Sequence, residues 1–401
     1  MAGTDISHLT ELYRNPVQCN FPEVLDVRLR REWPLKYGEN PHQSGGLYVL
    51  DSINRVNAGR IAELTDLVSV RSDGKGKGGL SATNTMDVTR AMDALKYFAH
   101  VPACVIMKHT IVSGFAKDDG SGKSNANLFL TARDCDVRSN YGGTAVFTRP
   151  VDMATAEALF SGLFVDVLAA PGYEEGVVGF IQRKSSNMRL AQFSHLDVLP
   201  KFRGDDPQGL LSIKEMPTGR FVVQDIYLTA VRSVEDLIVN PQLTDANGVH
   251  RVNCKPATRG MVDDCLSAWY INIAGARSNG VVAVRDGVLV SCGSGQVERV
   301  GAVSQMIVKG MQKAMDREGI KYDELHGMQG CENLRDNPFR KASVSSDGFI
   351  PFKDSIGLLG RVCVGAIIQP FGSKRDPEVI DELNEQEMCG LCTGERGFGH
   401  F

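Results

Sequence analysis

The fold is decided by residues 85–109, which read TMDVTRAMDALKYFAHVPACVIMKH. Over residues 85–99 the apolar side chains recur at helical spacing, on one face of a predicted helix: Val88, Ala91, Met92, Leu95 and Phe98. Residues 103–107, ACVIM, form a short uninterrupted apolar run of the kind that buried strands have. A helix followed by a buried strand predicts an α/β fold, in which helices pack on the faces of a sheet.

The same alternation continues outward along the chain. Residues 153–160 predict a helix, and LFVDVLAA at 163–170 predicts a strand. Residues 281–292, VVAVRDGVLVSC, predict a β-hairpin because an Asp-Gly pair suits the tight turn between two strands. The apolar spacing of residues 300–311 predicts a further helix.

Near the C-terminal end, VCVGAII at 362–368 predicts a buried strand. A helix is expected to follow it, with Asp376 as N-cap and Pro377 at its first position. Residues 200–260 are dotted with proline and glycine and have weak periodicity, so a domain boundary is placed at about residue 200. No repeat of fixed period is visible in the sequence.

Composition limits the class of protein. A length of 401 residues predicts two or three domains, at about 150 residues each. A hydrophobic content of 42% and a net charge of −4 favour a packed core and argue against a protein that holds nucleic acid or a membrane surface by bulk charge. The first residues lack the features of a signal peptide, and no apolar run reaches the ~18–20 residues needed to cross a bilayer. Ten scattered cysteines indicate reduced thiols and a cytoplasmic protein.

Three short motifs have weaker functional readings. Gly74–Gly79, GKGKGG, resembles a phosphate-binding loop but lacks its spacing, so a surface loop is favoured. Cys389–Cys392 is a CxxC without a second ligand pair, and structural thiols near a turn are favoured over zinc. Gly293–Gln296 precedes a predicted helix and is equally consistent with an anion site or a plain helix entry.

Five other segments concentrate groups that can do chemistry. Lys36–Gln43 gathers a cation, a phenol, an amide and an imidazole on one turn, although a structural turn is an equal alternative. Lys108 and His109 follow the ACVIM strand, where ligands bind in α/β folds, and His109 could transfer a proton. A solvated Lys with a loop-capping His is the alternative.

The remaining three segments are Ser278-Asn279, residues 346–354 and the last six residues. Residues 346–354, SDGFIPFKD, set aromatic faces beside a carboxylate, which suits a flat heterocycle, or form ordinary core. Residues 396–401, RGFGHF, suggest a docked tail because they are rich in Arg, Phe and His, although a frayed end is the default.

In this order the chain carries motifs that together resemble one family. They are YGENPHQ at 37–43, K-H-x-x-x-x-G from 108, D-x-x-S-x-x-G-G from 136, APGYEE at 170–175, Ser278-Asn279, G-x-G-Q-x-x-R from 293, SSD-x-F-x-PF-K-D from 345, IIQP-x-GS-x-RD from 367 and R-x-F-x-H from 396. The ordered set resembles the transformylase domain of the bifunctional purine enzyme, AICAR transformylase/IMP cyclohydrolase, from about residue 25 to the C-terminus.

The resemblance implies an α/β fold of two cytidine-deaminase-like subdomains, each a three-layer α-β-α unit, without the deaminase zinc. The implied divisions are an N-terminal segment at 1–24, a first subdomain at 25–200 and a second at 201–401. The resemblance also implies a homodimer with active sites at the interface. Only about 35 residues precede YGENPHQ, so the chain is expected to be a standalone transformylase, with a separate IMP cyclohydrolase in the pathway.

The implied reaction is formyl transfer from 10-formyltetrahydrofolate to the 5-amino group of AICAR, giving FAICAR and tetrahydrofolate in purine biosynthesis. AICAR is 5-aminoimidazole-4-carboxamide ribonucleotide. The implied catalytic residues are Lys108, His109 and Asn279. The implied nucleotide-binding residues are Lys36, Tyr37, Gly38, Asn40, His42, Phe349, Arg396, Phe398 and His400. The implied folate-side residues are Gln296, Arg299, Asp354 and Ser355. No metal ligand is expected from the sequence, and the family implies a potassium ion near the site.

The chain departs from the family pattern at several places. Lys36 stands where the family has Arg, which loses a bidentate phosphate contact. Ile111-Val112 replaces an Asn-Pro or Ser-Pro pair, Ile350 replaces a Phe, and Ser355 replaces an Asn. Two alternatives therefore stay open: the same fold and acceptor with a different formyl donor or heterocyclic amine, and a nucleotide-binding homologue without catalysis.

Overall fold

The computed structural model describes residues 4–12, 19, 21–40, 42–50, 79–185, 187–207, 209–276, 278–322 and 327–400. All of the GKGKGG stretch except Gly79, and Pro41 of the YGENPHQ turn, lie outside these residues. Within them, no helix combines the length and the apolar character that crossing a membrane requires.

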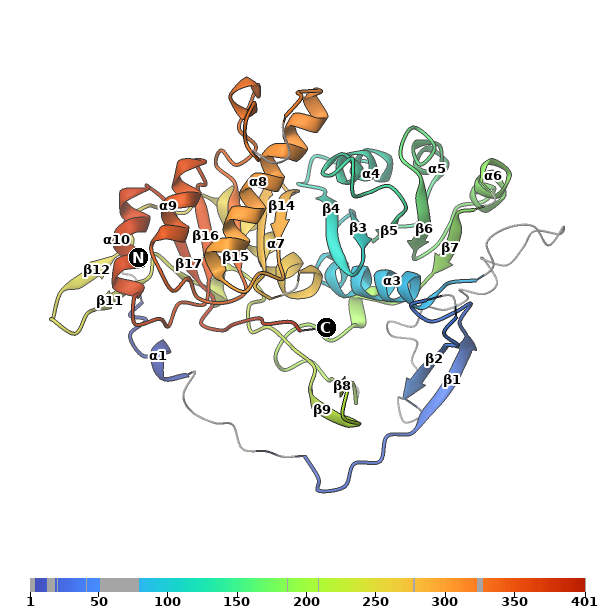
Figure 1. Cartoon of the computed structure of the whole chain (residues 1–401), viewed down its shortest axis with the longest axis horizontal. Helices are drawn as coiled ribbons and strands as arrows, with labels where there is room; N and C mark the ends of the chain where they lie inside the picture. The colour runs from blue at the N-terminus through green and yellow to red at the C-terminus, as the bar shows by residue number, and fades with distance from the viewer. Residues whose placement is uncertain are drawn as a thin grey trace.

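The centre of the molecule is one mixed sheet of eleven strands, in the order β10-β17-β16-β15-β13-β14-β4-β3-β5-β6-β7 (Figure 1). Its first half begins with α3 and ends with β7. The elements of this half are α3 Ala82–Leu95, η1 Lys96–Phe98, β3 Ala103–Lys108, β4 Ile111–Lys117, α4 Asn125–Asp134, β5 Gly143–Phe147, α5 Met153–Ala158, β6 Val165–Ala170, α6 Val177–Lys184 and β7 Arg189–Gln192.

The second half begins with α7 and ends with β17. Its elements are α7 Arg259–Gly275, β13 Val281–Arg285, β14 Val288–Gly293, α8 Arg299–Glu318, η4 Cys331–Asn333, β15 Ser343–Ser346, α9 Asp354–Arg361, β16 Ala366–Gln369, α10 Asp376–Glu385 and β17 Cys389–Cys392.

The two halves have the same topology. In each, a helix leads into an antiparallel hairpin, β3–β4 or β13–β14, and the first hairpin strand also pairs antiparallel with the third strand, β5 or β15. Two more strands then add in parallel, β6 and β7 or β16 and β17, each reached through a helix. The fold is therefore an internal duplication, which agrees with the two like subdomains that the family resemblance implies, although no sequence repeat of fixed period shows it.

The halves join where β4 meets β14. These strands are antiparallel and pair at Val288 and Ala116, and the Lys117 N–H donates to the Gly287 carbonyl at 3.0 Å. Because the joining strands run in opposite directions, the β3–β4 turn and the β13–β14 turn point to opposite edges of the sheet. The expected boundary at residues 200 and 201 falls after β7, in the connection between the halves, and stays a prediction.

The helices make two layers, one on each face of the sheet (Figure 1). Helices α3 and α7 share one face, and their apolar residues form one core cluster with inward residues of both halves, such as Val105, Val146 and Val282. On the other face, α4, α5 and α6 pack in one cluster and α8, α9 and α10 in another. The α/β class is thus confirmed, with three layers, while the likeness to cytidine deaminase stays a prediction.

Outside the duplicated core, β10 adds to the edge of the central sheet beside β17, and other segments form small hairpins. The connection between the halves contains two of them, and a third precedes α3. The additional elements are α1 Leu9–Leu12, β1 Leu29–Pro34, β2 Gly46–Leu50, η2 Leu196–Val198, β8 Leu211–Met216, β9 Arg220–Asp225, η3 Val234–Asp236, β10 Ile238–Val239, β11 Gln242–Thr244 and β12 His250–Val252. The β8–β9 hairpin projects from the body of the molecule (Figure 1).

Most elements expected from the sequence are present, with shifted ends. The Asp286-Gly287 hairpin is confirmed, and both turn residues have positive φ. The expected strand at 362–368 is wrong at its start, because Cys363 has a φ of 62° in a turn and β16 begins at Ala366. Asp376 is the first residue of α10 rather than its N-cap, but its carboxylate accepts the N–H groups of Gly372 and Ser373 in the preceding loop.

The CxxC motif was expected near a turn and instead forms β17 itself. All four of its residues are buried, and Cys389–Cys392 pair in parallel with β16. Both cysteines are free thiols. Burial raises the pKa of the Cys389 thiol to about 12, so the protonated thiol is the form that packs in the core.

The packing of α8 against its core cluster can be tested at Gly310. A Cβ at this position would lie 2.3 Å from Phe339 Cζ, and Phe339 is fully buried. We therefore expect Gly310→Ala to lower the free energy of unfolding by about 1–3 kcal/mol through overpacking, measured by urea denaturation. The matched control is Gly260→Ala in α7, where a Cβ would meet no atom within 4 Å, and equal effects of the two changes would contradict the packing argument.

Candidate functional site

Lys108 and His109 lie where β3 turns into β4. His109 and Thr110 form the turn, and both have left-handed backbones, with φ of 53° and 62°. A two-residue hairpin turn of this kind suits Asn-Gly or Asp-Gly, since other residues are strained at positive φ. A strained residue of this type costs about 1–3 kcal/mol, so the surroundings must hold the turn in place.

Asp87 of α3 is one such support. Its Oδ1 accepts the Thr110 N–H at 2.7 Å, and the residue is only 8% exposed. Burial raises the pKa of the Asp87 carboxyl, while the Thr110 N–H and the charges of His109 and Lys108 act in the opposite direction. Sequence reasoning missed Asp87, because nothing local connects it to a turn more than twenty positions later.

The exposed His109 opens into a cavity of about 690 Å³ beside α3. Glu39 of the YGENPHQ turn lines the same cavity, so the structure brings these two sequence-predicted segments together. Lys108 is half-buried, and its Nζ donates to the Tyr141 carbonyl at 2.7 Å. The remaining lining residues are Thr83, Met86, Asp87, Thr89, Arg90, Asp93 and Thr110.

Backbone hydrogen bonds attach the YGENPHQ turn to the start of α3. The Lys36 N–H donates to the Leu80 carbonyl at 3.2 Å, and the Ala82 N–H donates to the Tyr37 carbonyl at 3.1 Å. Within the turn, the Gly38 N–H donates to the Gln43 carbonyl, and the Asn40 N–H donates to the side-chain oxygen of Gln43. The side chains of Lys36, Asn40 and His42 are exposed, whereas Tyr37 and Gly38 are half-buried.

A second cavity, of about 840 Å³, contains the C-terminal tail. It is lined by Gly397–His400, by the β8–β9 hairpin and by the end of α7. The Arg396 guanidinium lies 4.9 Å from the Phe398 ring centroid, and the His400 ring packs edge-on to Phe398. The expectation of a docked tail is therefore correct. Thr89, Arg90 and Asp93 of α3 line both cavities, so this helix is their common wall.

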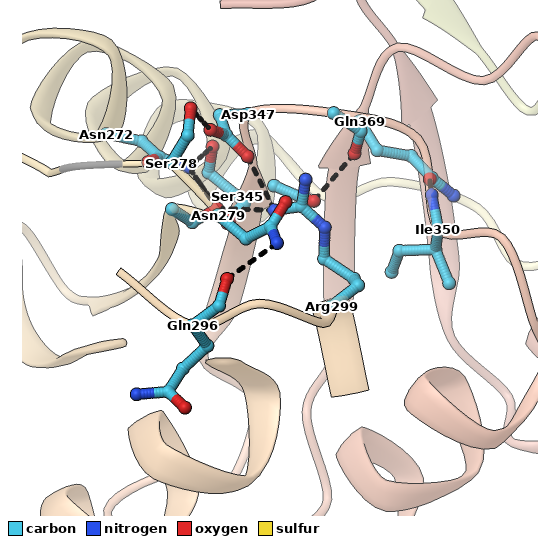
Figure 2. Close-up of polar contacts among 12 residues, drawn as sticks. Asn272, Ser278, Asn279, Gln296, Arg299, Ser345, Asp347, Ile350 and Gln369 are labelled. Carbon is cyan, nitrogen blue, oxygen red and sulfur yellow. Dashed lines mark hydrogen bonds and ion pairs between the residues drawn. The ribbon is translucent and has the colours of Figure 1, made fainter. Parts of the chain in front are cut away.

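Asn279 belongs to a polar cluster around Asp347 (Figure 2). Asn279 Nδ2 donates to the Gln296 carbonyl at 2.8 Å, which fixes the side chain above the loop that leads into α8. The neighbouring Ser278 Oγ donates to Asp347 at 2.7 Å and accepts the Gly399 N–H at 3.2 Å. These contacts bring Asn279 and the tail together.

Arg299 is buried in the same cluster, with 6% of its surface exposed. Its Nη1 donates to Asp347 Oδ1 and, at 3.1 Å, to the Gly280 carbonyl (Figure 2). The N–H of Gly397 donates to the Asp347 carbonyl at 2.8 Å. Arg299 therefore fixes Asp347, and Asp347 in turn binds the tail.

Glu395 is a second anchor of the tail, and the sequence analysis missed it. It is 7% exposed, and its Oε1 accepts from the Thr229 hydroxyl, the Tyr227 hydroxyl and the Ala230 N–H. Its Oε2 pairs with Arg203. Burial, followed by the negative charge of Glu395, raises the pKa of Tyr227 far above its usual value, so this phenol stays a hydrogen-bond donor.

The other predicted residues lie at the start of α9. Phe349 is half-buried in a smaller cavity of about 380 Å³, together with Phe352 and residues 372–375. Asp354 is exposed, and Ser355 is 1% exposed with its N–H bonded to Asp354 Oδ1. No described residue lines both this cavity and either the His109 cavity or the tail cavity.

Within the described part of the chain, no three His, Cys, Asp or Glu side chains are grouped so that they could hold a metal ion. The candidate residues offer an imidazole, a lysine amine, an asparagine amide and a docked tail of Arg, Phe and His. Such groups can transfer protons, stabilise negative charge and stack on a planar ring.

Comparison with known proteins identifies relatives along the whole chain. A family described as the AICARFT/IMPCHase bienzyme matches residues 5–309. The bifunctional purine biosynthesis protein PurH of Rhodopirellula baltica is 31% identical over 404 residues, covering 100% of this chain and 65% of its own length. The PurH proteins of an Anaeromyxobacter strain and of Chlorobium luteolum are 30% and 31% identical over 385 residues, covering 95% and 94% of this chain. The chain spans only 61–65% of the length of these three relatives.

The Glu395 anchor predicts how the tail responds to substitution. Glu395→Ala leaves the buried donors of residues 227–230 without an acceptor, so we expect a loss of about 1–3 kcal/mol in urea denaturation and faster tryptic cleavage after Arg396. Glu387→Ala is the control, because the Glu387 side chain is 82% exposed and its ion pair with Lys255, at 3.4 Å, lies on the surface. Indistinguishable cleavage of the two variants would show that Glu395 does not hold the tail.

Proposed function

Because this chain belongs to the AICARFT/IMPCHase bienzyme family, we propose that it transfers a formyl group from 10-formyltetrahydrofolate to the 5-amino group of AICAR. The products are FAICAR and tetrahydrofolate, in purine biosynthesis. The observation that carries the proposal is the pairing of His109 with the YGENPHQ turn in one cavity, next to a second cavity that contains the docked tail. Two adjoining cavities suit an enzyme with two substrates.

The chemistry requires three protein contributions. The amine of AICAR is a weak nucleophile, since its lone pair is delocalised toward the carboxamide. As its nitrogen bonds to the formyl carbon, a base takes the amine proton, and the tetrahedral oxyanion needs positive charge or a hydrogen-bond donor. The bond to N10 of the folate then breaks, and N10 receives a proton. The formyl group is transferred without any oxidation or reduction.

The residues that fit these roles are Lys108, His109 and Asn279. His109 moves the proton, because it is an exposed imidazole at a cavity. Lys108 supplies positive charge next to it, and its bond to the Tyr141 carbonyl fixes its direction. Asn279 donates its Nδ2 to the Gln296 carbonyl, and its amide oxygen is the acceptor assigned to the amine of AICAR.

AICAR is held by the first turn and by the aromatic tail in this proposal. The nucleotide-binding residues are Lys36, Tyr37, Gly38, Asn40, His42, Phe349, Arg396, Phe398 and His400. Phe398 is 42% exposed in the second cavity, which leaves its ring available to stack on the imidazole. Gln296 and Asp354 belong to the folate side, whereas the buried Arg299 and Ser355 act there by positioning their neighbours.

The family also implies a potassium ion near the site. Hard cations are bound by carboxylate and carbonyl oxygens. In the polar cluster the Asp347 carboxylate and the Gly280 carbonyl are such oxygens, but both already accept hydrogen bonds from the Arg299 guanidinium. These residues therefore do not fit a potassium ion at this place.

We further propose that the protein is a cytoplasmic homodimer, with active sites completed at the interface. The β8–β9 hairpin supports this, because Ile213, Phe221 and Val222 are 41%, 60% and 42% exposed on a projecting two-stranded hairpin. Such a hairpin is marginal in water unless another surface covers it. A separate IMP cyclohydrolase would close the ring of FAICAR in the following step.

Removal of the imidazole tests the catalytic assignment. His109→Ala is expected to lower kcat by about 10²–10⁴-fold in a tetrahydrofolate-forming absorbance assay with AICAR and 10-formyltetrahydrofolate. AICAR affinity, measured by calorimetry, should change by less than about threefold, because His109 is assigned to proton transfer and not to binding. The control is His250→Ala, an exposed histidine in β12.

Three results would contradict this reading. Full activity of His109→Ala would remove the residue from its role. Binding of AICAR without turnover by the unaltered protein would indicate a nucleotide-binding homologue. Turnover with another formyl donor but not with 10-formyltetrahydrofolate would show that the departure at Ile111-Val112, which forms the start of β4, accompanies a change of donor.

The hairpin assignment is tested by sedimentation. Phe221→Asp places a charge in the exposed apolar surface, so we expect the dimer to dissociate at micromolar concentration in analytical ultracentrifugation. Val249→Asp is the control, since Val249 is 49% exposed in a different hairpin. An unchanged sedimentation coefficient for Phe221→Asp would place any interface elsewhere.

A further inference from the structure

The internal duplication provides an independent view of the His109 turn. The turns that correspond in the two halves are His109-Thr110, between β3 and β4, and Asp286-Gly287, between β13 and β14. All four residues have positive φ, of 53°, 62°, 55° and 73°. The second turn therefore has a sequence suited to this backbone, whereas the first has the same backbone with a β-branched residue and a histidine.

The helices that precede the hairpins also correspond. Asp87 lies five residues after Ala82, the first residue of α3, and Asp264 lies five residues after Arg259, the first residue of α7. Asp264 accepts the N–H groups of Asp286 and Gly287, both at 2.8 Å. Asp87 accepts the N–H of Thr110 at 2.7 Å. In each half, therefore, an aspartate at the corresponding helix position binds the hairpin turn.

The two anchors also have similar surroundings. Asp87 and Asp264 are 8% and 7% exposed, and burial is the largest influence on the pKa of each, raising it. Keeping a carboxylate at such a position is unfavourable unless its hydrogen bonds offset the desolvation. In the second half the turn contains no residue of the proposed catalytic set. Asp264 therefore stabilises the fold there and has no catalytic role.

We propose that Asp87 is a positioning residue, which holds the left-handed His109-Thr110 turn and so fixes the His109 imidazole at the cavity. The inference rests on the proposed function for its catalytic meaning, but not for the contact itself. Because Thr110 has a Cβ in a backbone region that favours glycine, the turn would relax without the carboxylate. The imidazole would then move away from the direction that proton transfer requires.

The experiment compares Asp87→Ala, Asp87→Asn and the matched control Asp264→Ala. Asp87→Ala removes the acceptor, whereas Asp87→Asn keeps an oxygen that can accept the Thr110 N–H. We expect Asp87→Ala to lower kcat about 10²-fold with KM for AICAR changed less than about threefold, as a misplaced catalytic group does. Asp87→Asn should retain kcat within about fivefold, and Asp264→Ala should lower the melting temperature but leave kcat unchanged.

A second variant separates strain from simple loss of stability. In Asp87→Ala/Thr110→Gly the β-branched residue at positive φ is replaced by glycine and only His109 stays strained, so we expect this variant to recover at least about tenfold in kcat relative to Asp87→Ala. Hydrogen exchange of the peptide spanning residues 105–116 gives a readout that does not depend on activity. We expect exchange of the Thr110 amide to accelerate at least about tenfold in Asp87→Ala and to be unchanged in Asp264→Ala.

Two results would overturn the proposal: unchanged exchange at Thr110 in Asp87→Ala, or equal losses of kcat in Asp87→Ala and Asp264→Ala. Absence of formyl transfer by the unaltered protein would instead refute the proposed function. In that case exchange at Thr110 would still decide whether Asp87 holds the turn.

Discussion

The stacked rings of Tyr97 and Tyr270 connect the two halves of the molecule on one face of the sheet. Their centroids are 4.5 Å apart and their planes differ by 2°, and Phe98 and Phe202 pack edge-on around Tyr270. Both tyrosines are buried, within the core cluster that contains α3 and α7. Among the described residues, α3, the η1 turn that follows it and α7 form this layer of the duplicated core, so their contact helps to position the loops at their ends.

That arrangement explains why the site is assembled from distant segments. The YGENPHQ turn is bonded to the start of α3, the His109 turn is held from within α3, and the tail crosses the end of α7, where a Cβ on Gly397 would lie 2.5 Å from Ile273 Cγ2. Asn279 follows α7 directly and meets the tail through Ser278. Each segment reaches the candidate site because it contacts, or directly follows, one of these two helices.

The sequence predicted those helices and hairpins whose residues lie close together along the chain. The apolar face of residues 85–99 and the Asp286-Gly287 turn are visible because helix and hairpin rules act over a few residues. The two like halves were expected only from the family resemblance, because they share topology without a repeated sequence motif. Asp87 and Glu395 were missed for a related reason, since their partners, at Thr110 and at residues 227–230, become neighbours only after the helices have packed. The docked tail was predicted from its composition alone, but the hydrogen bonds that dock it were not.

The common wall between the two cavities has a consequence for kinetic studies. Arg90 and Asp93 form a salt bridge at 3.3 Å and face both spaces, so a charged molecule that enters one space competes for a group that also shapes the other. Under the proposed function, substitutions at these two positions would alter the apparent affinity for both reactants at once. Thermodynamic double-mutant cycles, rather than single variants, are needed to apportion such effects between the two binding events.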